Sequence, residues 1–151
     1  MQFYSTNRKT SPVSLREAVV RGLATDRGLF MPEVIRRFPP AFYQNMKEMT
    51  LREISFVVAE AFFGENVEAG KLKEIVDETL NFDIPLVQVA DNRYSLELFH
   101  GPTLAFKDVG ARFMARLLAY FNKQEGERQV NVLVATSGDT GSAVAVSYTH
   151  L

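Results

Sequence analysis

The residue with the clearest capacity for covalent chemistry in this sequence is a lysine, Lys107, which ends an apolar stretch. Residues 97–108 read ELFHGPTLAFKD, so two aromatic residues, a glycine and a proline precede that lysine. A neutral lysine amine attacks a carbonyl to form a Schiff base, and apolar surroundings favour the neutral amine. The position at the start of a helix also disfavours the charged ammonium. Most lysines are simply solvated, so the residues alone are compatible both with a nucleophile and with an ordinary solvated side chain.

A second stretch, residues 136–143, has the composition of an anion-binding turn. It reads TSGDTGSA and follows VNVLVA at 130–135, a nearly all-apolar run typical of a strand buried on both faces of a parallel sheet. Ligands of open α/β sheets bind where such strands pass into helix N-termini, whose unpaired N–H groups attract carboxylates and phosphates. Gly138 and Gly141 would let a ligand approach the backbone. A capped helix start without a ligand explains the same composition.

The elements before Lys107 are predicted to form a mainly helical N-terminal lobe. Ser14 and Glu17 have the spacing of a capping box, which predicts a short helix directly after them. Residues 22–35, with two glycines and a proline, are predicted as an irregular packing loop. Apolar residues recur at helical spacing between residues 40 and 80, which predicts about three helices.

The elements around Lys107 predict the beginning of an open α/β sheet. Two alternating segments separated by Asp91 and Asn92 predict a hairpin. A helix with an apolar stripe should follow the lysine, with Arg112 and Arg116 on its solvated face. Together with the buried strand, the turn and the next helix, these elements favour an α/β fold.

Composition excludes several classes of function. The 151 residues include 17 basic and 18 acidic side chains, so no basic surface for nucleic acid is expected. With no cysteine and two histidines, neither disulfides nor a metal site are expected. The first twenty residues lack the apolar core of a signal peptide, and no apolar run could span a membrane. We expect a cytoplasmic protein without a membrane partner.

The two chemical stretches occur in a combination that resembles one enzyme family. LELFHGPTLAFKD followed by ATSGDTGSAVA is similar to the threonine synthase family, pyridoxal-phosphate enzymes of fold type II. The N-terminal FYST and VSLREAVVRGLATDRGLFMPE are similar to that family's small N-terminal domain. The resemblance implies a helical N-terminal domain over 1–80 and, over 81–145, the truncated start of a three-layer αβα catalytic domain. Residues 146–151, VSYTHL, do not resemble the family.

The resemblance also implies roles for individual residues. Lys107 would be the Schiff-base lysine that holds pyridoxal 5'-phosphate and then acts as general acid and base. Phe106 would support the pyridine ring, and Asp139 would lie near the cofactor's phenolic oxygen. The substrate carboxylate would be bound by the loop residues Ser137, Gly138 and Thr140. The implied reaction, a lyase step of threonine biosynthesis, converts O-phosphohomoserine and water to threonine and phosphate.

Some positions depart from the family pattern. Arg27 stands where the family usually has a smaller residue, often glycine. The family binds the cofactor phosphate in a separate glycine-rich loop and pairs the pyridine nitrogen with a hydroxyl residue, and neither is found in this sequence. We therefore expect the isolated chain to be inactive or nearly so.

Three other functions are compatible with parts of the sequence. The chain could be a non-catalytic fragment of such an enzyme, or a threonine synthase-like phospho-lyase with a different product. The DTGS run at 139–142 matches the aspartic-protease signature, but that motif needs a second copy and a β-rich setting. Of the remaining polar residues, His100 is predicted to be hydrogen-bonded within a tight turn, and Thr103 to cap a helix.

Overall fold

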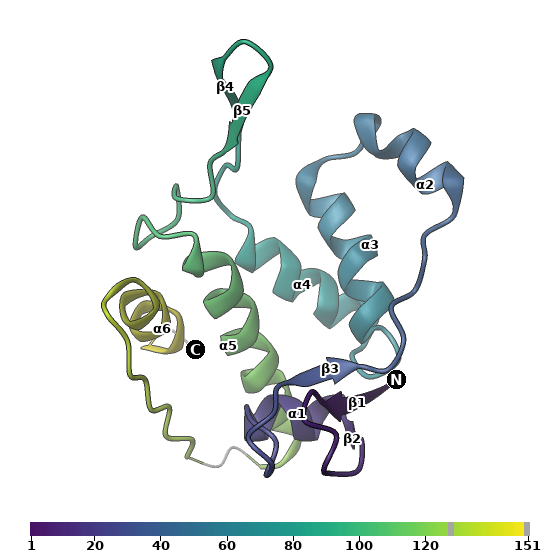
Figure 1. Cartoon of the computed structure of the whole chain (residues 1–151), viewed down its shortest axis with the longest axis vertical. Coiled ribbons are helices and arrows are strands. Elements are labelled where there is room, and N and C mark those ends of the chain that lie inside the picture. Colours follow the sequence, from purple (N-terminus) through teal and green to yellow (C-terminus); the bar gives the residue numbers. More distant parts are fainter. Residues whose placement is uncertain (127–128, 150–151) are drawn as a thin grey trace. The chain divides into compact units, whose positions relative to one another are not determined.

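The computed structural model describes residues 1–126 and 129–149, which belong to two compact units, Met1–Asp77 and Glu78–Leu151 (Figure 1). Within the described ranges, no helix has both the length and the apolar character required to cross a membrane.

A small antiparallel sheet opens the first unit. Its strands are β1 (Gln2–Ser5), β2 (Val13–Ser14) and β3 (Phe30–Pro32), and β1 lies between the other two. Phe3 of β1, which is buried, pairs with Val13 on one side and with Pro32 on the other. The sequence analysis missed this sheet because strands of two to four residues are too short to show an alternating pattern. The segment predicted as an irregular loop therefore contains β3.

The helices of the N-terminal part follow the prediction. They are α1 (Leu15–Arg21), α2 (Pro40–Asn45), α3 (Leu51–Phe63) and α4 (Ala69–Thr79), with a 3₁₀ turn, η1 (Met46–Glu48), after α2. Ser14 caps α1, since its hydroxyl accepts a bond from the Glu17 N–H at 3.2 Å. The Glu17 carboxylate pairs with Arg21 at 2.9 Å instead of completing the box. The buried apolar residues of this unit come from the sheet and from helices α1, α3 and α4, and they include Phe3, Leu15, Ala18, Val19, Ala59, Leu72, Ile75 and Val76.

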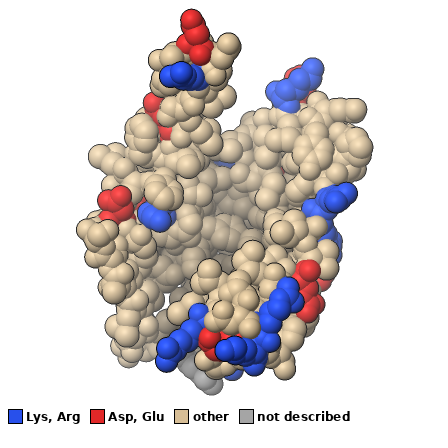
Figure 2. All heavy atoms as spheres, viewed as in Figure 1, with Lys and Arg blue, Asp and Glu red and all other residues tan. Residues whose placement is uncertain are grey.

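The second unit contains a hairpin and two packed helices. The predicted hairpin is confirmed as β4 (Leu86–Ala90) and β5 (Arg93–Leu96), joined by a turn in which Asn92 has φ +56°. Figure 2 shows acidic and basic side chains side by side on this hairpin. Helix α5 (Lys107–Gln124) is confirmed as well, and α6 (Asp139–Thr149) packs beside it (Figure 1). The buried apolar residues of these helices include Ala115, Leu117 and Phe121 of α5 and Ala143 of α6.

The strand predicted over residues 130–135 is wrong for this chain. The segment has no regular secondary structure, and all of its residues are exposed, with Leu133 at 95%. A buried strand exists only as a member of a sheet, and within the described ranges both sheets are antiparallel and exclude this segment. The α/β class is confirmed, but the described residues of the second unit contribute helices and a hairpin rather than a parallel sheet.

Candidate functional site

Lys107 lies in a pocket of the second unit, at the first position of α5. The pocket has a volume of about 530 Å³, and its walls are mostly apolar. Three residues with predicted roles, Lys107, Phe106 and Thr140, lie on it together. The other lining residues are Leu98, Val109, Gly110, Ala111, Met114, Val144 and Tyr148. The pocket therefore lies between the segment before α5, the first turns of α5 and one side of α6.

The lysine amine is placed beside an aromatic ring. Lys107 Nζ lies 4.5 Å from the centroid of the Phe106 ring, within the range of a cation–π contact. The apolar enclosure predicted for Lys107 is only partial. Leu104 is 76% exposed and Phe106 is 55% exposed, while Lys107 itself is half-buried. The lysine is thus accessible from solvent and bordered by an apolar wall.

The glycine-bearing stretch 136–143, which runs into the first turns of α6, contributes one residue to this pocket. Thr140 lines it, whereas Ser137, Gly138 and Asp139 are exposed and do not. Gly138 has φ +144°, a conformation that favours glycine, and its carbonyl accepts bonds from the Ser142 N–H and hydroxyl at 2.9 and 3.2 Å. Of the four consecutive site residues predicted at 137–140, one therefore lies on the pocket wall and three lie on the exposed surface.

Gly141 of the same stretch serves packing rather than ligand access. A Cβ at this position would lie 2.5 Å from the methyl group of Thr136. The Thr136 hydroxyl in turn accepts a bond from the Gly138 N–H at 3.3 Å. The prediction that this glycine admits a ligand is therefore not supported, because its small size accommodates Thr136.

Asp108, the residue after Lys107, was given no role by the sequence analysis. Its side chain is completely buried and accepts two hydrogen bonds from Thr103, one from the N–H at 2.9 Å and one from the hydroxyl at 2.7 Å. The prediction that Thr103 caps a helix is therefore wrong for α5. Thr103 donates to Asp108, and the N-cap position belongs to Phe106. The only feature of the sequence that could have indicated these bonds is a threonine five positions before an aspartate at the start of a predicted helix.

His100 is hydrogen-bonded within its turn, as predicted. Its Nε2 lies 2.7 Å from Oε2 of Glu97, and its ring packs against Phe99 with centroids 4.8 Å apart. His100 is not among the residues that line the Lys107 pocket. The prediction that His100 is a hydrogen-bonded residue of a turn is confirmed.

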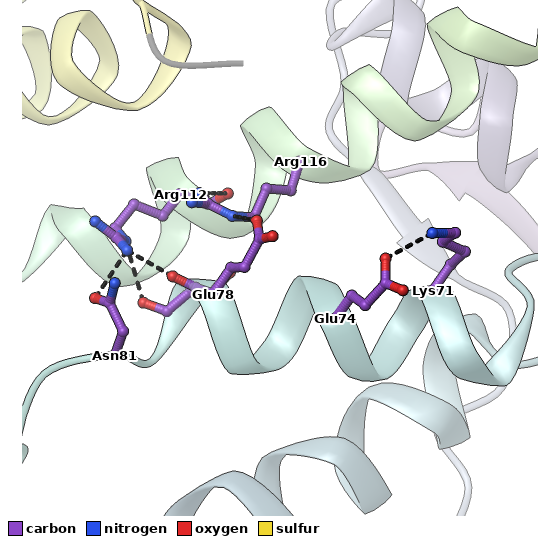
Figure 3. A network of polar contacts seen from close by, with 7 residues as sticks. Lys71, Glu74, Glu78, Asn81, Arg112 and Arg116 are labelled. Atoms are coloured by element: carbon purple, nitrogen blue, oxygen red, sulfur yellow. Dashed lines mark hydrogen bonds and ion pairs between the residues drawn. The ribbon is translucent and has the colours of Figure 1, made fainter.

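The prediction that Arg112 lies on a solvated face of α5 is wrong. Figure 3 shows its guanidinium at the C-terminal end of α4, where Nε donates to the Thr79 carbonyl at 3.1 Å and Nη2 to Asn81 Oδ1 at 2.8 Å. Arg116 joins the network through Glu78 at 2.7 Å. Desolvation lowers the pKa of Arg112, and the nearby charge of Arg116 lowers it further. Arg112 thus satisfies carbonyl groups that a helix end leaves without partners, and it ties α5 to them.

Residues 146–149, part of the segment predicted as an atypical tail, continue α6, while 150–151 lie outside the described residues. Tyr148 contributes to the wall of the Lys107 pocket, and burial raises the pKa of its hydroxyl.

Comparison with known proteins places the chain in one family. Residues 2–80 match the family model described as "Threonine synthase N terminus". Over 148 residues the chain is 40% identical to threonine synthase from Serratia marcescens and 38% identical to that from Escherichia coli. Each alignment covers 98% of this chain and 34% of the relative, so the chain spans about a third of the length of these curated relatives.

Solved structures agree with the sequence comparisons. The crystal structure of threonine synthase from Escherichia coli superposes with a TM-score of 0.90 at 38% identity, covering 98% of this chain and 34% of the other. A structure of PLP-bound threonine synthase from Brucella melitensis superposes with a TM-score of 0.91 at 34% identity, covering 98% and 33%.

Proposed function

Since the chain belongs to the threonine synthase family, we propose that Lys107 is the lysine that holds pyridoxal phosphate in an enzyme of threonine biosynthesis. The proposed reaction is the conversion of O-phosphohomoserine and water to threonine and phosphate. The single observation that supports it most is the pocket, which brings Lys107, Phe106 and Thr140 together at the start of two helices.

The residues of the pocket are compatible with this cofactor. Its volume of about 530 Å³ falls in the range of small-molecule sites, and its apolar wall suits a planar ring. The Lys107 amine would hold the cofactor at its aldehyde carbon, and the Phe106 ring would contact the pyridine face. The bound cofactor supplies an electron sink for negative charge that develops on the substrate carbons.

The chain's own groups have separate tasks in this proposal. The Lys107 amine takes a proton from the substrate's α carbon and returns protons as general acid and base. Phe106 covers the amine on one side and reduces its contact with water. Thr140 and the N–H groups at the start of α6 would bind the substrate carboxylate, because a helix N-terminus attracts anions.

Three further roles stay predictions. Ser137 and Gly138 would complete the carboxylate site, and Asp139 would lie near the cofactor's phenolic oxygen. All three are exposed and outside the pocket wall, so these roles require the turn to close over a bound substrate. The domain boundary near residue 80 and the separate character of 146–151 also stay predictions.

Cofactor attachment can be tested directly on this chain. After addition of pyridoxal phosphate, the absorbance spectrum is recorded, the adduct is reduced with borohydride, and the labelled peptide is identified by mass spectrometry. We expect the label on Lys107 and its loss in Lys107→Ala. Lys123→Ala is the matched control, since Lys123 lies near the other end of α5 and is exposed. Equal labelling of all lysines in the unsubstituted chain would contradict the proposal.

The reaction itself needs a second measurement. Incubation with pyridoxal phosphate and O-phosphohomoserine, followed by assays for phosphate and threonine, distinguishes the remaining alternatives. Phosphate release with another product would indicate a threonine synthase-like phospho-lyase. A Lys107 adduct without any turnover would indicate a chain that binds the cofactor but does not catalyse the reaction.

A further inference from the structure

Hydrogen bonds between Thr103 and Asp108 close a short segment of the chain, residues 103–108, which contains Lys107. Asp108 Oδ2 accepts a bond from the Thr103 N–H at 2.9 Å, and Oδ1 accepts one from its hydroxyl at 2.7 Å. The carboxylate is completely buried, so water does not compete for these bonds. We call this pair the Thr103–Asp108 clasp.

Backbone hydrogen bonds complete the same structure. The Leu104 N–H donates to the Gly101 carbonyl at 3.0 Å, and the Asp108 N–H donates to the Ala105 carbonyl at 3.0 Å. Leu104 has φ +57°, which a leucine rarely adopts without other restraints. The loop therefore holds an unfavourable conformation, and the clasp is a buried side-chain contact that connects it to α5.

The clasp has no room for a larger residue at Gly101. A Cβ at that position would lie 2.5 Å from Oδ2 and 2.9 Å from Cβ of Asp108. Gly101 is itself buried, and so is Ala105 on the other side of the loop. The Asp108 carboxylate is thus held by the two Thr103 donors and lies close against Gly101.

We propose that Asp108 is a positioning residue for Lys107, which it aligns with the pocket through the Thr103–Asp108 clasp. In sequence, Lys107 lies between the two clasp residues. Its Nζ contacts the ring of Phe106, which belongs to the same loop. Opening of the clasp frees residues 101–106 and with them the ring that borders the amine. Asp108 acts through geometry and touches no reacting atom. The consequence for cofactor attachment rests on the proposed function of Lys107, whereas the ordering of the loop does not.

The ordering of the loop is tested without any cofactor. Amide hydrogen exchange is measured in the unsubstituted chain and in the variants Asp108→Asn, Thr103→Val and Thr103→Ser. The Thr103 amide should exchange about tenfold faster in Asp108→Asn, because a bond to a buried charged acceptor is weakened. Thr103→Val should accelerate exchange at its neighbour Leu104, and Thr103→Ser, which keeps the hydroxyl, should not. Asp91→Asn, in the exposed hairpin turn, is the matched control.

The position of the lysine is tested by competitive acetylation in the same samples. The ratio of Lys107 to Lys123 labelling should change at least about twofold in Asp108→Asn and in Thr103→Val, and stay constant in Thr103→Ser and Asp91→Asn. Thr103→Val leaves every charge in place, so an effect there comes from geometry and not from the lost charge of Asp108.

Borohydride trapping with pyridoxal phosphate then connects the clasp to the proposed function. We expect the yield of Lys107 adduct to fall at least about threefold in Thr103→Val and Asp108→Asn, with rescue by Thr103→Ser. If the unsubstituted chain gives no Lys107 adduct, the proposed function fails, and exchange and acetylation still decide the role of the clasp. Unchanged exchange and an unchanged Lys107 to Lys123 ratio in both clasp variants would overturn the positioning role.

Discussion

Each unit of the molecule contains a loop organised by one aspartate, and the two loops differ in what they hold. In the first unit, Asp26 accepts bonds from the Ser5 hydroxyl at 2.6 Å, the Lys9 N–H at 2.9 Å and the Gly28 N–H at 3.0 Å. In the second unit, Asp108 accepts both of its bonds from Thr103. Asp26 therefore joins segments distant in sequence, whereas Asp108 closes a local ring.

The two loops share their other components. Each has a glycine too close to a neighbouring side chain to carry a Cβ, Gly28 beside Ser5 and Gly101 beside Asp108. Each also has a residue other than glycine at positive φ, Arg27 at +67° and Leu104 at +57°. The same local chemistry thus connects the strands of a structural unit in one case and borders a candidate catalytic lysine in the other. The difference predicts that damage to the first loop lowers stability, while damage to the second also changes Lys107.

The largest expected effect comes from adding a methyl group at the two glycines. In Gly28→Ala the new Cβ would lie 2.0 Å from Ser5 Oγ and 2.9 Å from the Asn7 backbone nitrogen, so we expect a loss of about 3 kcal/mol in unfolding free energy. Gly101→Ala should cost about 2 kcal/mol, because the atoms nearest its added Cβ all belong to the Asp108 side chain, whereas those nearest Gly28 include a backbone nitrogen. Urea denaturation measures both.

Gly110→Ala provides the control for these two variants. This glycine lies within α5 with no atom within 4 Å of an added Cβ, so alanine should stabilise the chain by up to about 1 kcal/mol. Similar losses at all three glycines would contradict the idea that two of them are required by close contacts.

A second test uses pH to examine the contribution of Asp26. The hydrogen bond from Ser5 lowers the pKa of Asp26, with smaller contributions from the Gly28 and Lys9 amides. A lowered folded-state pKa stabilises the protein above the unfolded value of 3.8, and this contribution is lost as the pH falls through the folded value. The difference in stability between the unsubstituted chain and Asp26→Asn should therefore be largest near neutral pH and shrink below about pH 4.

The measurement is thermal or urea unfolding of both proteins across that pH range. Lys107 adduct formation should be unchanged in Asp26→Asn at neutral pH if the two loops have the separate tasks described above. A constant stability difference at every pH would show that the Asp26 bonds do not depend on its charge.

A third test concerns the residues at positive φ. Arg27→Gly should stabilise the first unit by about 1 kcal/mol, because glycine adopts this conformation without steric cost. Leu104→Gly should give a similar gain, since Leu104 is 76% exposed and loses little burial. Denaturation midpoints check both, and a destabilised Leu104→Gly would show that this side chain makes contacts that matter for the loop.

The smallest effect is expected for a carboxylate that binds no backbone group. Glu74 pairs with Lys71 at 2.7 Å on the exposed side of α4 (Figure 3). Exposed pairs of this kind contribute little, so Glu74→Gln should change stability by less than about 0.5 kcal/mol. A loss as large as that of the loop variants would show that simple charge pairing, rather than the hydrogen bonds to the loops, is the stabilising factor.

Features that depend only on neighbouring residues could be predicted from the residue order. They include the cap at Ser14, the hairpin turn at Asn92 and the helix after Lys107. The resemblance to the threonine synthase family was also recognised from short motifs. Capping, turn formation and helical periodicity act over a few residues, so residue order is sufficient to predict them.

Features that depend on burial, or on partners distant along the chain, became apparent in the three-dimensional fold. It placed Arg112 on the carbonyl groups at the end of α4, buried Asp108 against Thr103, and brought Thr140 into the pocket of Lys107. It also left residues 130–135 unpaired, although their composition predicts a buried strand. Composition states what a segment is able to bury, whereas the packing of other segments against it determines whether it is buried.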